Sequence, residues 1–372
     1  MKLFCKSSSP PPVGNIPNGI SSSVNPSINQ RRLSAFKANR RGYISFLLFV
    51  LLVCITIPAE FIANDKPIII SYKNSLYFPI LQFYPETEFG GYFTTEANYT
   101  DPFVQAQIAK YGWSLSPLIP YSYLSVNFNI ARAPSPPSAQ NWLGVDDQGR
   151  DVLARLVYGF RLSILFALIL TIISSIIGIT IGAIQGFFGG WIDLLTQRFI
   201  EIWHGLPVLY MLIILSSFVE PSFWWLLLLM LLFSWMDLVG MVRAEFLKVR
   251  NYDYVRSARS LGVSEFKIMY RHILPNATIS VMTYLPFILS GAVTTLTSLD
   301  FLGFGLPASS PSLGELLAQG KTNPTAPWLG VTAFVALATL LTLMIFIGEA
   351  LRDALNPHKV HVHKSPKVKV AS

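Results

Sequence analysis

Residues 162–187 contain no Asp, Glu, Lys or Arg. A helix needs about 20 predominantly apolar residues to cross the hydrocarbon core of a bilayer, so this run is long enough to span one. Similar apolar runs lie at residues 43–62, 199–219, 223–242, 277–299 and 328–348. The whole chain is 52% hydrophobic and only 13% charged, whereas a soluble domain carries about a quarter charged residues. The sequence therefore predicts an all-α integral membrane protein with six transmembrane helices.

The whole chain has a net charge of +8, and its basic residues gather in the N-terminal tail, in residues 243–276 and in the C-terminal tail. Six spans place these three segments on one side of the membrane, and short basic segments are typical of the cytoplasmic side. We therefore expect both termini in the cytoplasm, and we see no indication of nucleic-acid binding. The first run resembles a signal peptide in following basic residues, but it is nearly long enough to span and lacks a clear cleavage site.

The same reasoning divides the chain into five parts. They are a disordered basic cytoplasmic tail (1–42), the first span (43–62), a periplasmic insertion (63–161), a five-helix core (162–350) and a cytoplasmic C-terminal tail (351–372). The insertion is rich in Phe, Tyr and Trp, which disordered segments lack, so we expect it to be folded. Its surface either meets a substrate-delivery protein or caps the outer helix ends, and the sequence leaves both open.

Three carboxylates surround Gly149 near the end of the insertion. Asp146 or Asp147 is placed to cap a helix that carries Val152, Leu153, Leu156 and Val157 on one face. A calcium site is disfavoured because an EF-hand needs ligands over twelve residues with an acidic end, and no such run is present. Cys5 and Cys54 support neither a disulfide framework nor a metal site.

Small residues recur every fourth position in the second span, at Ser174, Gly178, Gly182 and Gly186. Such a ridge lets helices approach closely in lipid, either within this chain or against another one. In the third span, Glu201 and His204 share a helix face, which suggests a proton relay or, more simply, ion pairing near the inner end. Gly291 and the hydroxylated residues 294–298 offer groups that could line a passage.

Residues 243–276 form a polar, basic loop between two spans, and we expect two short helices in it. The first begins near Asn251 or Asp253, either of which can cap it. Gly262 suits the C-terminal cap, where a residue of positive φ is needed. Ser264 can cap the second helix, and Pro275 is expected to help end it.

This loop resembles the EAA loop in permease subunits of ABC-type importers. In that pattern Glu-Ala-Ala is followed three residues later by Gly, and then by Ile-x-Leu-Pro. The spacing of Ala258, Gly262, Leu274 and Pro275 matches, while Arg256, Ser257 and His272 depart from the pattern. The resemblance implies docking on an ATP-binding subunit through the following residues: Arg256, Ser257, Ala258, Leu261, Gly262, Leu274 and Pro275. On this basis Ala258 and Gly262 are expected to be small because the docking cleft admits no larger side chain.

The block at residues 143–163 and the run from Arg271 to Asn276 resemble C-type permeases of dipeptide and oligopeptide importers. The long aromatic insertion is similar to importers of oligopeptides and microcin C-like antibiotics. This resemblance implies a non-catalytic subunit in a bacterial inner membrane. Its implied partners are a homologous second permease, one or two ATP-binding subunits, a periplasmic substrate-binding protein and the peptide.

No cofactor is expected in this chain. Gly320, Lys321 and Thr322 resemble the end of a P-loop, but Glu315 stands where its first Gly is required, so ATP is expected on another chain. Two alternatives remain: a permease for nickel or another small solute, and a secondary transporter driven by an ion gradient. The secondary transporter predicts repeats, broken helices and buried charges near mid-membrane.

Overall fold

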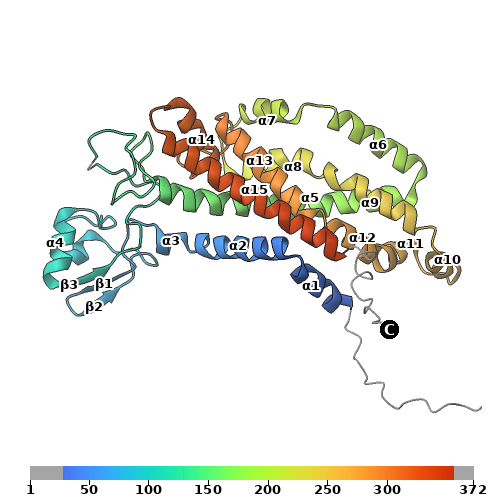
Figure 1. The fold of residues 1–372 in the computed structure, drawn as a ribbon, viewed down its shortest axis with the longest axis horizontal. Helices are drawn as coiled ribbons and strands as arrows, with labels where there is room; N and C mark the ends of the chain where they lie inside the picture. Colours follow the sequence, from blue (N-terminus) through green and yellow to red (C-terminus); the bar gives the residue numbers. More distant parts are fainter. Residues whose placement is uncertain (1–27, 129, 356–372) are drawn as a thin grey trace, which may run out of the picture.

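The computed structural model describes residues 28–128 and 130–355, and it shows an elongated, mainly helical molecule (Figure 1). The elements from the N-terminus through the insertion are α1 (Ile28–Ala38), α2 (Arg40–Thr56), α3 (Ala59–Ile62), β1 (Ile69–Tyr72), β2 (Ser75–Tyr77), the 3₁₀ helix η1 (Glu86–Phe89), α4 (Pro102–Tyr111) and β3 (Gly112–Leu115). The membrane core contains α5 (Val152–Phe188), α6 (Gly190–His204), α7 (Val208–Ser216), α8 (Phe223–Ser234) and α9 (Met236–Val249). The remaining elements are α10 (Asp253–Ser260), α11 (Glu265–Lys267), the π-helix η2 (Ile268–Ile273), α12 (Leu274–Met282), α13 (Leu285–Phe301), α14 (Leu313–Thr322) and α15 (Pro327–Leu355).

The expected spans correspond to helices of different regularity. Three helices in the described part of the chain are long and apolar enough to cross a membrane: α5, the continuous α8–α9 segment and α15. The pairs α1–α2 and α6–α7 also pass the length and composition test, but they bend by 93° and 73°. The remaining expected span corresponds to the shorter apolar helix α13. The mainly helical membrane fold is thus confirmed, whereas the count of six transmembrane helices stays a prediction.

The region predicted as a disordered tail is partly helical, which corrects that prediction. Residues 28–38 form α1, and Asn39 caps α2 by accepting a hydrogen bond from the Gly42 N–H at 3.3 Å. The Phe36 ring makes edge contacts with Tyr43 and Phe46 across the 93° bend. Local capping and aromatic packing therefore order residues whose composition alone suggested disorder. The predictions for residues 1–27 and 356–372 lie outside the described residues.

The insertion has its own small core at one end of the molecule (Figure 1). Its antiparallel sheet has the order β2-β1-β3, with Ile70 opposite Tyr77 on one side and opposite Ser114 on the other. Tyr72, Phe89 and Tyr99 pack beside this sheet and α4. The aromatic residues that indicated an ordered insertion thus form its core, and the sheet adds a small β component to the helical fold.

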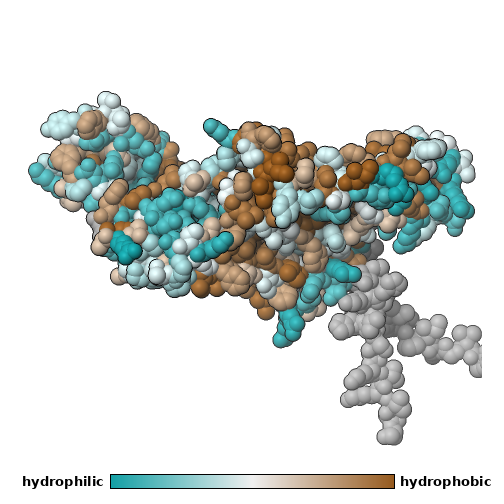
Figure 2. Space-filling model, turned by 90° about the horizontal axis from the view of Figure 1, so that it is seen from above, coloured by the Kyte–Doolittle hydropathy of each residue, from teal (hydrophilic) through white to brown (hydrophobic). Residues whose placement is uncertain are grey.

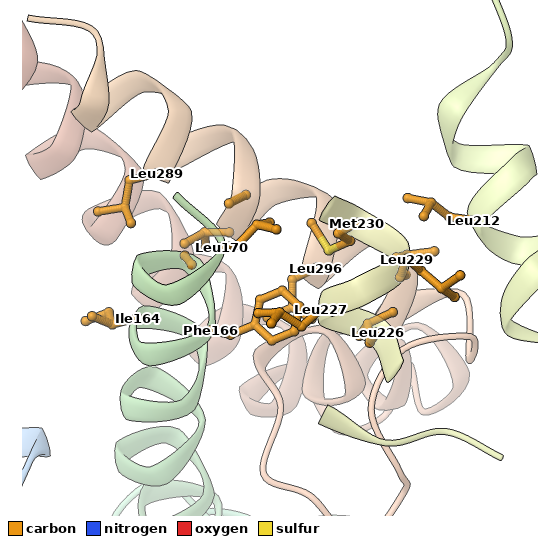
Figure 3. Packing of buried hydrophobic residues seen from close by; sticks show 14 of the residues in the cluster. Ile164, Phe166, Leu170, Leu212, Leu226, Leu227, Leu229, Met230, Leu289 and Leu296 are labelled. Atoms are coloured by element: carbon orange, nitrogen blue, oxygen red, sulfur yellow. The ribbon is translucent and has the colours of Figure 1, made fainter. Parts of the chain in front are cut away.

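The main hydrophobic core joins α5, α7, α8 and α13, and Figure 3 shows Phe166, Leu226 and Leu296 among its members. A second cluster continues from α5 and α9 into the loop after α9. Figure 2 shows apolar residues over the middle of one face and more hydrophilic residues toward both ends. This distribution agrees with a bundle whose long axis crosses a bilayer.

The ridge of small residues on α5 lies against α9 within this chain. A Cβ added to Gly178, Gly182 or Gly186 would come within 2.5, 2.8 or 2.6 Å of a backbone carbonyl oxygen on the facing segment. Ser174 is also buried, and its hydroxyl donates to the Thr171 carbonyl oxygen. The glycines therefore permit the close approach of α5 and α9.

Candidate functional site

The loop between α9 and α13 lies at the opposite end of the molecule from the insertion (Figure 1). It contains α10, α11, η2 and α12. The described N-terminal helix α1 and the C-terminal end of α15 lie at this same end. These three described elements therefore lie at one end of the bundle, and the cytoplasmic location of both termini stays a prediction.

Helix α10 has one buried and one exposed face. Val255 and Ala258 point into the protein, with 0% and 8% of their surfaces exposed, whereas Arg256 and Ser257 are exposed. Leu261 at the end of this helix is 82% exposed. Packing within this chain is therefore sufficient to explain the small size of Ala258, and contact of this residue with a docking cleft stays a prediction. The outward face presents Arg256, Ser257 and Leu261 instead.

The start of α10 does not use the expected side-chain cap. Tyr252 occupies the N-cap position, and the helix has no side-chain capping hydrogen bond. Asn251 instead donates its amide to the Leu247 carbonyl oxygen at 3.3 Å. Packing of Val255 and Ala258 against the second cluster holds this helix in place without the cap.

Gly262 makes the turn between α10 and α11, with φ of +77°. The Gly262 N–H donates to the Arg259 carbonyl, and the Val263 N–H donates to the Ala258 carbonyl. These bonds use carbonyls that the helix end leaves free, and the left-handed conformation favours glycine. No atom of residues 28–128 and 130–355 lies within 4 Å of a Cβ added at Gly262. Its side of the turn is therefore open.

An ion pair closes the same turn. Arg259 donates two hydrogen bonds to the Glu265 carboxylate, at 2.8 and 3.0 Å. These hydrogen bonds raise the pKa of Arg259 above its ordinary value, so the guanidinium stays charged. Both side chains are about half exposed, and exposed pairs of this kind contribute little to stability. The pair orients the turn more than it stabilises the protein.

Pro275 does not end the second helix, contrary to the prediction. The chain continues from α11 through the π-helical turn η2 into α12, and Pro275 lies in the first turn of α12. A proline is tolerated in a first turn because its missing N–H has no helical partner there. Leu274 is half-buried beside the second cluster, and Pro275 is exposed. The side chain of Asn276 lies outside the described residues.

The outward surface of this loop combines apolar and basic groups. Phe266 is 72% exposed and Tyr270 66% exposed, close in sequence to Lys267 and Arg271, which are also exposed. On the inner side, Ile268 and Ile273 are fully buried in the cluster that also contains Phe246 of α9 and Ile288 of α13. A force applied to the exposed side would thus reach two long helices through close-packed side chains.

The predicted pair of Glu201 and His204 does not form a relay. Glu201 accepts a hydrogen bond from Arg198 at 2.6 Å, and both side chains are substantially exposed. His204 lines an intramembrane cavity together with Asp237. Glu201 and His204 both lie on α6, but only His204 lines the cavity.

A buried ionic cluster at the N-terminal end of α5 was not predicted. Arg150 donates to Asp146 at 2.7 Å and to Glu315 of α14 at 3.0 Å, and Arg155 also pairs with Glu315. The spacing of Asp146 and Arg150 was a possible signal, but nothing in the sequence links them to Glu315. This cluster connects the end of the insertion to α14.

The carboxylates around Gly149 also behave differently from the prediction. Asp151, rather than Asp146 or Asp147, caps α5 by accepting from the Ala154 N–H at 2.8 Å. Asp146 instead forms ion pairs with Arg150 and Arg155. Within residues 28–128 and 130–355, no three His, Cys, Asp or Glu side chains converge as a metal site would require.

Comparisons with known proteins agree with this arrangement. Residues 178–361 match the family model of the binding-protein-dependent transport system inner membrane component. The chain is 55% identical over 333 residues to the inner membrane ABC transporter permease protein YejE of Escherichia coli, covering 89% of this chain and 98% of the relative. It is also 55% identical over 355 residues to the peptidoglycan transport system permease protein YejE of Agrobacterium fabrum, covering 89% and 93%.

A more distant relative is the oligopeptide transport system permease protein OppC of Mycobacterium bovis. It is 34% identical over 248 residues, which cover 66% of this chain and 84% of the relative. The aligned length, the family match and the helical membrane architecture lead to one conclusion. The chain belongs to the family of inner membrane components of binding-protein-dependent transport systems.

Proposed function

We propose that this chain is the permease subunit of an ATP-driven importer that takes up peptides. It forms half of a translocation path with a homologous second permease. A substrate-binding protein delivers cargo on the side of the insertion, and ATP-binding subunits dock at the opposite end. The bundle lies in a bacterial inner membrane with both termini in the cytoplasm. The chain itself catalyses no reaction.

The observation that carries this proposal is the build of the loop between α9 and α13. Its outer face exposes Arg256, Ser257 and Leu261, and its inner face is packed against the core through Val255 and Ala258. An element that is exposed on one side and firmly packed on the other can pass a partner's movement to α9 and α13. Leu274 and Pro275 continue this connection into α12.

The relatives' names guide the choice of cargo. The Mycobacterium relative is named for oligopeptides and the Agrobacterium relative for peptidoglycan. We therefore propose oligopeptides as cargo, with peptide-linked antibiotics and peptidoglycan fragments as the next candidates. A nickel permease has less support, since no metal-binding cluster occurs in the described residues.

One feature expected of a secondary transporter, a broken helix, is present. The α6–α7 pair is bent by 73° around Gly205 and Pro207, and broken helices are typical of such transporters. Membership in the binding-protein-dependent family nevertheless favours a transport system whose energy comes from partner subunits. The broken helix is better explained as part of the path through the bundle.

The test is reconstitution. The tagged chain is co-expressed with the candidate second permease and ATP-binding subunits, purified in mild detergent and placed in proteoliposomes with its binding protein. We expect a stable complex whose ATPase activity and peptide uptake both depend on the binding protein. A chain that purifies only alone or as a homodimer, under conditions that keep a known importer intact, contradicts the proposal.

Gly262 offers a sharper test of docking at the loop. Gly262→Asn keeps a residue that tolerates positive φ, whereas Gly262→Leu adds strain of about 1–2 kcal/mol and a bulky group. Because the space around this position is open in the chain itself, we expect both variants to fold and only Gly262→Leu to lose ATPase-subunit binding and transport. Full peptide uptake by Gly262→Leu contradicts docking here.

A further inference from the structure

A cavity of about 410 Å³ lies inside the membrane bundle, between α5, the α6–α7 break, α8–α9 and α13. This volume falls in the range of about 300–1,000 Å³ that small-ligand sites occupy. Most of its wall is apolar, and its polar groups come from a few residues: His204, Ser234, Asp237, Tyr284 and Thr295. The cavity is thus suited to a mainly apolar ligand with a small number of polar ends.

Asp237 is the acidic group of this wall. It lies 14 residues after Phe223 in the Phe223–Val249 segment, which corresponds to about 21 Å of helical rise. A carboxylate at this depth is costly in a bilayer and is usually paired or functional. None of the nine ion pairs found in the described part of the chain involves Asp237. Its side chain is exposed and borders the cavity.

An aromatic contact holds the part of the wall that carries His204. Trp203 stacks on Phe233 with ring centroids 5.8 Å apart, and its indole donates to the Leu232 carbonyl at 3.2 Å. This contact fixes the end of α6 on α8 and so places the neighbouring His204 on the cavity wall. The remaining wall includes Gly291 of α13, where no atom of the described part of the chain lies within 4 Å of an added Cβ. The end of α6 that carries His204 is therefore held on α8, while the Gly291 position on α13 has free space among the described residues.

We propose that Asp237 is a cation subsite in the translocation path and receives an ammonium group of the peptide in transit. This inference rests on the proposed function. The α-amino terminus is the ammonium group that every unmodified peptide shares, and a lysine side chain offers the same chemistry. The apolar wall accommodates side chains of varied kind, whereas the single carboxylate recognises the one charge that does not depend on sequence.

The experiment uses the assembled importer in proteoliposomes and three labelled probes. They are trialanine, N-acetyl-trialanine and N-acetyl-alanyl-lysyl-alanine. The affinity of the isolated binding protein for each probe is measured first, so that uptake is compared at equal occupancy of that protein. Asp237→Asn removes the charge at nearly unchanged volume, Asp237→Glu restores it, and Glu201→Gln is the control for a nearby carboxylate outside the cavity.

We expect Asp237→Asn to lower trialanine uptake about tenfold, because a hydrogen bond to a charged group is lost. N-acetyl-trialanine uptake changes less than about twofold, since it carries no ammonium group that this subsite would bind. Asp237→Glu recovers trialanine uptake, and Glu201→Gln retains it. Dependence of the lysyl probe on Asp237 assigns the subsite to any ammonium group, and its independence assigns it to the amino terminus.

Two outcomes overturn the inference: trialanine uptake unaffected by Asp237→Asn, or an equal loss for trialanine and N-acetyl-trialanine. Equal melting temperatures of the wild-type and Asp237→Asn complexes show that any loss does not come from misfolding. A wild-type complex that transports no peptide refutes the proposed function itself. An active wild type with an unaffected Asp237→Asn variant refutes only the cation subsite.

Discussion

Two neighbouring residues on α10 lie on its buried face and on its exposed face. Ala258 is 8% exposed, and the adjacent Ser257 is exposed. The two positions therefore test different faces of one short helix. Packing within the chain is thus a sufficient reason for the small size of Ala258, and its contact with a partner stays a prediction.

Leucine at these two positions should have different effects. We expect Ala258→Leu to destabilise the chain by about 1–3 kcal/mol, since extra atoms in a packed cluster force neighbours to move. Ser257→Leu should leave the melting temperature in detergent unchanged but reduce co-purification of the ATP-binding subunit. Equal melting temperatures for both variants would show that Ala258 is not packed as described.

The buried cap of α5 predicts a pH effect with a definite sign. Burial raises the pKa of the Asp151 carboxyl above its ordinary value of 3.8. The folded state therefore binds this proton more tightly than the unfolded state between 3.8 and the raised pKa. The contribution of this group to the free energy of unfolding falls as pH rises through that window, and it is regained on acidification.

Asp151→Asn keeps an oxygen that can accept from the Ala154 N–H but does not titrate. We expect the melting temperature of the wild type, relative to the variant, to increase as pH is lowered from 7 to about 4, toward the ordinary carboxyl pKa. Thermal denaturation at several pH values measures this difference. Parallel pH profiles for the two proteins would contradict the assigned burial cost.

At the scale of elements, the contact between α5 and α9 depends on the absence of side chains. A Cβ at Gly182 would lie 2.8 Å from the Val239 carbonyl oxygen, and backbone cannot move aside cheaply. Gly240 on α9 is different, because none of the residues that the structure describes comes within 4 Å of a Cβ added there. These two glycines form a matched pair for the same substitution.

We expect Gly182→Ala to cost about 1–3 kcal/mol through overpacking. Gly240→Ala should be neutral or should stabilise the chain by up to about 1 kcal/mol, because alanine favours a helix over glycine. Melting temperatures in detergent and the yield of assembled complex compare them. A destabilisation of similar size in both variants would indicate a general loss of helix flexibility rather than a close contact.

At the scale of the whole molecule, one ionic cluster connects parts far apart in the sequence. Glu315 of α14 pairs with Arg150 and Arg155, whose side chains are 4% and 0% exposed. Removing one partner of a buried ion pair leaves an uncompensated charge, which is much more costly than losing an exposed pair. The Glu60–Arg161 pair provides a comparison, because its side chains are 43% and 24% exposed.

We expect Glu315→Gln to destabilise the chain by roughly 3 kcal/mol, and Glu60→Gln by less than about 1 kcal/mol. Protease sensitivity of the insertion and the melting temperature are the measurements. A greater effect of Glu60→Gln would show that the outer end of the bundle is held by the first span rather than by α14.

The sequence by itself determined the membrane class, the location of the apolar segments, the basic loop and its Gly262 turn. These features depend on local composition and spacing: a long apolar run is soluble in a bilayer whatever its neighbours, and a positive φ favours glycine. The aromatic content likewise indicated a folded insertion. Family resemblance added the transport function, which no physical pattern supplied.

Only the tertiary structure decided which faces of these elements are buried. It placed Ala258 inward, packed the Gly178–Gly186 ridge on α9, continued the helix past Pro275 and brought Glu315 to Arg150 and Arg155. It also set Asp237 beside a cavity. Each outcome depends on which distant segment lies opposite a side chain. That information comes from long-range packing, which the spacing of residues along one helix does not contain.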